Sequence, residues 1–121
     1  MRIIEITSKH FTVDAKIKLY LEKKVQKLVD YIPRHARRSA TASAQITKKN
    51  ARGAGQLECE IILNLPSQKL VARECKDGVL AAIDGSEEKM RSQIRRYKAE
   101  LISARDQGGF LGQLKRSLKR Q

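Results

Sequence analysis

Apolar residues recur along this chain with two different periods, and the changes of period divide it into six elements. Alternation of apolar and polar residues, which is typical of half-buried strands, predicts four strands, over Arg2–Ser8, Ser39–Thr47, Leu57–Leu65 and Lys69–Glu74. In the first strand Ile4 and Ile6 fall on one face. The inner face of the second strand is mostly alanine and that of the third is mostly leucine and isoleucine, so we expect a helix layer to pack on them.

Two segments instead show the spacing of an amphipathic helix. The first starts after Asp14, whose carboxylate can accept from free N–H groups of the first turn. It should stop near Tyr31, because Pro33 favours an extended residue before it. The second helix spans about 77–104, and Gly85 and Glu87 interrupt its apolar stripe. Gly85 costs about 1 kcal/mol relative to alanine, so we expect a bend or a soft turn there.

The order β-α-β-β-β-α predicts an α+β fold, with a four-stranded sheet and two helices packed on one face. The other face of the sheet should be open and polar. We expect one domain over residues 1–104 and a basic, flexible tail over 105–121. The tail has leucines at near-helical spacing, so it could also be an amphipathic helix on a membrane or partner, but we favour a basic arm that orders on RNA.

Charge narrows the range of functions. The 121 residues carry a net charge of +13 and the pI is near 10.2, and from Lys89 to Gln121 there are ten Lys or Arg against two acids. This balance favours RNA, including the RNA surface of a ribosome, over an acidic protein or a membrane. The chain has no apolar run of signal-peptide or membrane-span length, so we expect a cytoplasmic protein.

No enzyme constellation is evident, and we expect no catalytic, cofactor or metal site. Cys59 and Cys75 form no CxxC pair and are interpreted as small core residues, and His10 and His35 as surface residues. The outward positions of the predicted sheet have no aromatic side chain in the second to fourth strands, so the sheet is a poor platform for stacking bases.

The helices therefore carry the candidate RNA-binding residues, which would contact phosphates rather than bases. The candidates flank the two apolar stripes and could border a common groove or ridge: Lys23, Lys24, Lys27, Lys89, Arg91, Arg95, Arg96 and Lys98. A solvated helix face is the alternative interpretation. Secondary phosphate contacts could come from an acid-free stretch that contains Arg34, Arg37, Arg38, Lys48, Lys49 and Arg52.

These residues resemble a known family. The stretch Ala81-Ala82-Ile83-Asp84, followed by Lys89-Met90, Gln93-Ile94 and Tyr97-Lys98, is similar to the second helix of the ribosome hibernation-promoting factors, also called ribosome-associated inhibitor A or sigma-54 modulation proteins. Asp14, Ile17, Tyr20-Leu21, Lys24-Val25 and Leu28 are similar to the first helix of that family. The chain departs from the pattern at Glu87, where an apolar residue is usual, and at Arg91, where an acidic residue is frequent.

The resemblance implies a non-enzymatic stress or stationary-phase factor. It would bind rRNA of the small ribosomal subunit in the channel for mRNA and tRNA, on whole ribosomes too, and block translation of idle ribosomes. The chain resembles the short form, without the C-terminal dimerisation domain, and we expect a monomer off the ribosome. A general structured-RNA-binding protein is the second hypothesis, and a small RNA-cleaving enzyme is the third.

Overall fold

The computed structural model describes residues 1–49 and 56–108, with side chains as far as Ser103. Its elements follow one another as β1 (Arg2–Lys9), α1 (Ala15–Lys27), the 3-10 turn η1 (Leu28–Tyr31), α2 (Arg34–Arg37), β2 (Thr41–Lys48), β3 (Leu57–Leu65), β4 (Gln68–Lys76) and α3 (Val79–Gly108). The predicted tail beyond Gly108 lies outside the described residues, so the predicted division at residue 104 stays a prediction.

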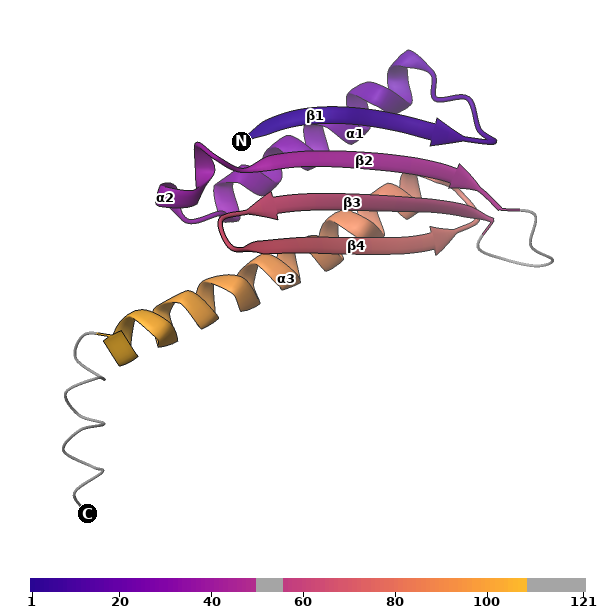
Figure 1. Cartoon of the computed structure of the whole chain (residues 1–121). Coiled ribbons are helices and arrows are strands. Elements are labelled where there is room, and N and C mark those ends of the chain that lie inside the picture. Colours follow the sequence, from indigo (N-terminus) through magenta and orange to yellow (C-terminus); the bar gives the residue numbers. More distant parts are fainter. Residues whose placement is uncertain (50–55, 109–121) are drawn as a thin grey trace.

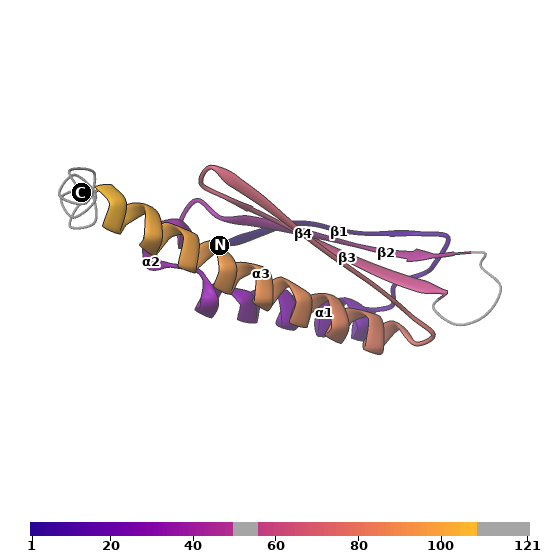
Figure 2. The same cartoon turned by 90° about the horizontal axis from the view of Figure 1, so that it is seen from below.

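The four strands form one sheet in the order β1-β2-β3-β4 (Figure 1). β1 runs parallel to β2, and the other neighbours are antiparallel. Figure 2 shows α1 and α3 side by side beneath one face of this sheet. The predicted α+β fold, with both long helices on one face, is therefore confirmed.

The core lies between the sheet and the helices. Ala42, Ala44 and Ile46 of β2 are buried, and the inner side chains of β3 are buried beside them. α3 packs chiefly on β3 and β4, whereas α1 packs on β1 and along α3. Both predicted inner faces are thus confirmed, and the alanine face of β2 lies at the centre of the sheet.

The face assigned to β1 from its alternation was wrong at one position. The pairing with β2 shifts between Ile3 and Glu5, so Ile4 lies in a bulge. Ile3 and Ile6 face the core, while Ile4 is 57 % exposed. A bulge changes which residues share a face, and alternation within one strand cannot reveal it.

The boundaries of the first helix agree with the prediction. Asp14 Oδ1 accepts from the backbone N–H of Ile17 at 2.8 Å, which confirms the N-cap. The helix tightens into η1 and ends at Tyr31, and Ile32 is extended before Pro33. The short helix α2 was not predicted; its single turn buries Ala36.

The expected bend at Gly85 is absent, because α3 continues through it. The glycine lets α3 lie close to β4, because a Cβ at this position would lie 2.5 Å from Cγ of Glu74 on that strand. The sequence suggested a helix break, but the residue permits packing between α3 and β4. The helix also runs to Gly108, four residues beyond the predicted end.

We expect Gly85→Ala to lower the free energy of unfolding by about 1 kcal/mol, because the clash with Glu74 outweighs the better helix propensity of alanine. In a Glu74→Ala background, which removes the clashing atoms, the same change should instead stabilise by up to about 1 kcal/mol. Urea unfolding of the four variants measures both effects. An equal effect of Gly85→Ala in the two backgrounds would contradict this account.

Candidate nucleic-acid interface

The two long helices meet along a seam that ionic and aromatic contacts cross. Tyr20 on α1 donates a hydrogen bond from its hydroxyl to Asp84 on α3, and Lys24 Nζ lies 3.3 Å from the same carboxylate. Lys24 also lies over the Tyr20 ring, 5.5 Å from its centroid. Further along the seam the Arg91 guanidinium lies 5.9 Å from the Tyr31 ring. The earlier seam residues Tyr20 and Lys24 contact Asp84, and the later Tyr31 contacts the later Arg91, so the two helices run in the same direction.

Glu87 and Arg91, which both depart from the family pattern, form an ion pair with each other. Arg91 Nε lies 2.8 Å from Glu87 Oε1 across one helical turn. The contact is an ion pair without a well-directed hydrogen bond, since Nε is buried and finds no hydrogen-bond acceptor in the described structure. Glu87 is only 4 % exposed, so Arg91 balances a buried negative charge. The two departures are physically coupled, because each side chain supplies the charge partner of the other.

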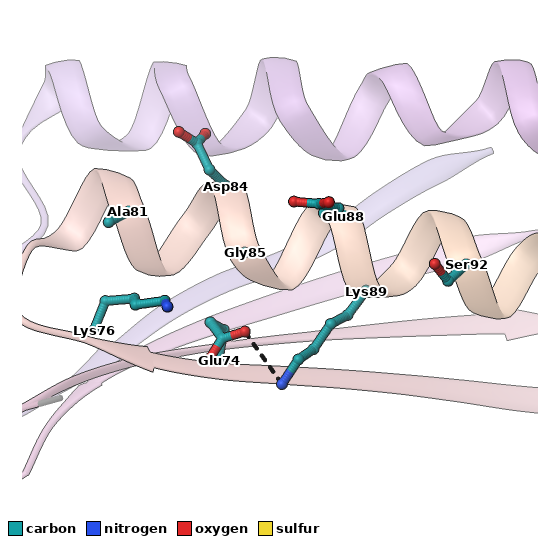
Figure 3. Close-up of a pocket in the computed structure, with 8 residues that line it drawn as sticks. All are labelled: Glu74, Lys76, Ala81, Asp84, Gly85, Glu88, Lys89 and Ser92. Atoms are coloured by element: carbon teal, nitrogen blue, oxygen red, sulfur yellow. Dashed lines mark ion pairs between the residues drawn. The ribbon is translucent and has the colours of Figure 1, made fainter.

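The side chains on the opposite flank of α3 contact the free edge of β4. Lys89 Nζ lies 3.2 Å from Glu74 Oε2 and donates to the carbonyl of Arg73 at 3.0 Å. Figure 3 shows Lys89 reaching from the helix toward Glu74, while Asp84 points to the other side. Gln93 donates to the carbonyl of Val71 at 2.6 Å. These side chains satisfy backbone acceptors that an edge strand would otherwise expose.

The eight predicted RNA-binding residues therefore fall into two groups. Lys24, Lys89 and Arg91 are paired with carboxylates. The other five are exposed, and none has a carboxylate within ion-pair distance among the described side chains: Lys23, Lys27, Arg95, Arg96 and Lys98. The second group has the cations that are available to an outside anion.

The five available cations do not all lie on one flank. At 100° per residue, Arg95 and Lys98 share the side of α3 that carries Arg91 and faces the α1 seam. Arg96 shares the side that carries Lys89 and faces β4. Of the two predicted alternatives, a groove or a ridge, this placement favours a ridge: α3 carries cations on both of its flanks, and Lys23 and Lys27 lie on α1 beside one flank.

Hydrogen bonding shifts the pKa values of the seam residues. The hydrogen bond to Asp84 and burial raise the pKa of Tyr20. Burial lowers the pKa of Lys24, but its bond to Asp84 and the charge of that carboxylate outweigh burial, so the pKa is raised overall. On the other flank, the bond from Lys89 holds the pKa of Glu74 below its usual value. Both shifts favour the forms that already prevail at neutral pH, neutral Tyr20 and charged Lys24.

Sequence reasoning named the cations but missed the partners that restrain them. It did not identify Asp84 and Glu87 as counter-charges, or the two tyrosines as contacts of Lys24 and Arg91. The spacings of Tyr20 to Lys24 and of Glu87 to Arg91, both i to i+4, were the available signal. The contact across the seam has no such signal, because it joins residues 64 positions apart.

Within the described part of the chain, the residues predicted as secondary phosphate contacts also fall into two groups, those with partners inside the fold and those exposed without a carboxylate partner. Arg37 is used within the fold, because its Nε donates to the carbonyl of Ile32 at 2.9 Å and its Nη2 to that of Asp30 at 3.3 Å. Lys49 pairs with Glu58 at 2.8 Å. Arg34, Arg38 and Lys48 are exposed, and Arg52 lies outside the described residues.

The cysteines differ from each other. Cys59 is buried, as expected, and burial raises its pKa to about 11. Cys75 is exposed, so its interpretation as a core residue was wrong: it lies on the outward face of β4, opposite Glu58.

Within residues 1–49 and 56–108, no group of three His, Cys, Asp or Glu is placed to hold a metal ion. Over the same residues, no helix has the length and apolar character needed to cross a membrane.

Comparison with known proteins decides the family. The family model described as Sigma 54 modulation protein / S30EA ribosomal protein matches residues 4–102. The chain belongs to this family. The motif residues from which the resemblance was inferred, in and beside α1 and along α3 as far as Lys98, lie within this match.

Individual relatives agree with the assignment. The chain is similar to the ribosome hibernation promotion factor of Deinococcus radiodurans, at 24 % identity over 108 residues. That match covers 89 % of this chain and 55 % of the relative, so the chain spans about half the length of that protein.

Two solved structures share the fold. The crystal structure of the N-terminal domain of Thermus thermophilus Protein Y matches with a TM-score of 0.67 at 23 % identity, over 80 % of this chain and 99 % of that one. A ribosomal subunit interface protein from Coxiella burnetii matches with a TM-score of 0.64 at 18 % identity, over 82 % and 99 %. At these identities the likeness shows the fold.

We expect Arg91→Gln to destabilise the protein by about 1–3 kcal/mol, because it leaves the buried Glu87 carboxylate without its charge partner. Arg95→Gln, on the same flank but without a carboxylate partner, should change the stability by no more than about 0.5 kcal/mol. The double variant Glu87→Gln, Arg91→Gln should recover part of the loss. Chemical denaturation of the three variants tests this, and equal stability of Arg91→Gln and Arg95→Gln would refute the role of the pair.

We expect Asp84→Asn to lower the pKa of Tyr20 toward its ordinary value near 10, because the negative charge that opposes ionisation is gone. A raised pKa means that the neutral phenol is favoured in the fold. This contribution to stability is therefore present below about pH 10 and is lost as the pH rises through the folded pKa. Tyrosinate absorbance during alkaline titration measures the shift. Tyr20→Phe identifies the transition, and an unmoved transition in Asp84→Asn would disprove the interaction.

Proposed function

We propose that this protein binds the small ribosomal subunit, and whole ribosomes through it, in the channel used by mRNA and tRNA, and so blocks translation of idle ribosomes. The observation that carries the proposal is the family match over residues 4–102. The names of the relatives support it, since they are a hibernation promotion factor and a ribosomal subunit interface protein.

The charge distribution supports the same function. The exposed, unpaired cations of α1 and α3 form a rigid ridge that suits contact with the phosphates of folded rRNA. On the opposite face of the sheet two of the cations are already neutralised, because Arg73 pairs with Glu60 and Lys49 with Glu58. One face would therefore meet RNA by charge and shape.

The mechanism we propose is steric and needs no bond to be made or broken. A protein held by phosphate contacts in an RNA-walled channel excludes mRNA and tRNA as long as it stays bound. We therefore propose a non-enzymatic, cytoplasmic factor that needs no cofactor and is a monomer off the ribosome. In this proposal residues 1–104 form the ribosome-binding domain and residues 105–121 a basic tail.

We expect Arg95→Gln with Arg96→Gln to weaken ribosome binding roughly tenfold, which is about 1.4 kcal/mol. The two changes should also reduce the slope of log affinity against log salt by about 1–2, because up to two phosphate contacts are lost. Co-sedimentation with ribosomes on sucrose gradients at several salt concentrations measures both quantities. Lys69→Gln with Lys76→Gln on β4 is the control, since it removes the same charge from exposed positions outside the helices.

Wild-type affinity of the Arg95, Arg96 variant at all salt concentrations would overturn the site assignment. Failure of the wild-type protein to sediment with small subunits at any salt concentration would overturn the function itself. In that case binding to structured RNA in general becomes the leading interpretation of the charge.

A further inference from the structure

β1 and β2 end at the end of the sheet opposite the part of α3 that extends beyond it (Figure 1). A basic hollow lies at these two strand ends. The two strands are parallel, and Lys9 pairs in register with Thr47, so their ends lie together. The hollow has a volume of about 540 Å³. Its lining residues are Lys9, His10, Thr47, Lys48 and Lys49.

Among the described residues, the lining has four with basic side chains, one with a hydroxyl group and none with a carboxylate. Lys49 pairs at 2.8 Å with Glu58 on the neighbouring strand β3. Lys9 and Lys48 are exposed and have no ion-pair partner among the described side chains. Lys9 and Lys48, from adjacent strands, therefore line one hollow without an ion-pair partner among the described side chains.

The backbone shapes one rim of the hollow. His10 directly follows β1 and has a φ of 58°, in the left-handed region. Histidine adopts this region more often than most residues that have a Cβ. The sharp change of direction comes directly after β1, and His10 lines the hollow beside Lys9. In the described structure this ring makes no hydrogen bond or ion pair with a protein group.

We propose that this hollow binds a phosphate group of an RNA backbone, as a second anchoring point separate from the α1 and α3 ridge. The ammonium groups of Lys9 and Lys48 and the hydroxyl of Thr47 are donors that suit a phosphate, and the neighbouring carboxylate of Glu58 is already paired with Lys49. The hollow is several times larger than a free phosphate ion, so the sugars on either side of a chain phosphate have room. The choice of RNA as the source of the phosphate rests on the proposed function.

The test uses the full chain in solution without ribosomes. A short single-stranded RNA and, separately, inorganic phosphate are titrated while NMR follows the His10 ring and the Thr47 and Lys48 amides. RNA should shift all three. Lys9→Gln with Lys48→Gln should abolish these shifts and reduce the affinity for the RNA about five- to tenfold, because two phosphate-facing charges are lost.

Two control variants separate the hollow from the ridge. Lys69→Gln with Lys76→Gln removes the same charge elsewhere, and Arg95→Gln with Arg96→Gln removes ridge cations. Both should keep the RNA-induced shifts at His10 and Thr47. Loss of these shifts in either control would mean that they report general charge, and would overturn the proposal.

Two results with the wild-type protein alone also overturn the proposal, so it does not depend on whether a variant folds. One is the absence of shifts at the three reporters with RNA. The other is an equal response to inorganic phosphate at equal phosphate concentration, which would identify a site for the free ion. Sedimentation with ribosomes is read separately, so its failure would affect the proposed function and not the hollow.

Discussion

The structure depends on the packing of two parallel helices on a single face of the sheet. Each helix has one apolar stripe, and the inner sides of all four strands are covered by these two stripes. Met90, Ile94 and Tyr97 bury the inward side of α3 over about two turns. Charge can then lie only on the outer side and on the two flanks of each helix. The position of the cations is thus a consequence of how the core is buried.

The flanks show why a high positive charge does not by itself define a binding surface. Along the α1 seam, Asp84 and Glu87 take up Lys24 and Arg91, and along β4, Glu74 takes up Lys89. The Lys24–Asp84 pair joins the two helices and the Lys89–Glu74 pair joins α3 to the sheet edge, whereas Glu87–Arg91 lies within α3. The cations further out stay available, and they are presented by a helix whose orientation the pairs restrain. The paired cations therefore stabilise the fold, and the unpaired cations on the same surface are available to an outside anion.

Much of the fold followed from local pattern, and the misses share one cause. β2, β3 and the Asp14 cap were predictable because alternation and capping act within a few residues. The exposed Ile4, the straight helix at Gly85 and the partner of Lys24 were not, because each depends on a neighbour distant in sequence. Of the candidate site, sequence identified the cations through charge and family motif, but only contacts between elements show which of them are already neutralised.

The two ends of the molecule differ in how they could meet an RNA. The ridge carries its cations on side chains of a continuous helix, so its spacing is fixed by the helical rise and suits a rigid, folded partner. The hollow instead gathers its cations from two strand ends around one point. An RNA held at both would span the length of the sheet, and the relative orientation of protein and RNA would then be set by two separated contacts. A single basic patch leaves rotation about that patch free, whereas two contacts remove it, which is what a protein needs if it is to occupy a channel in one orientation.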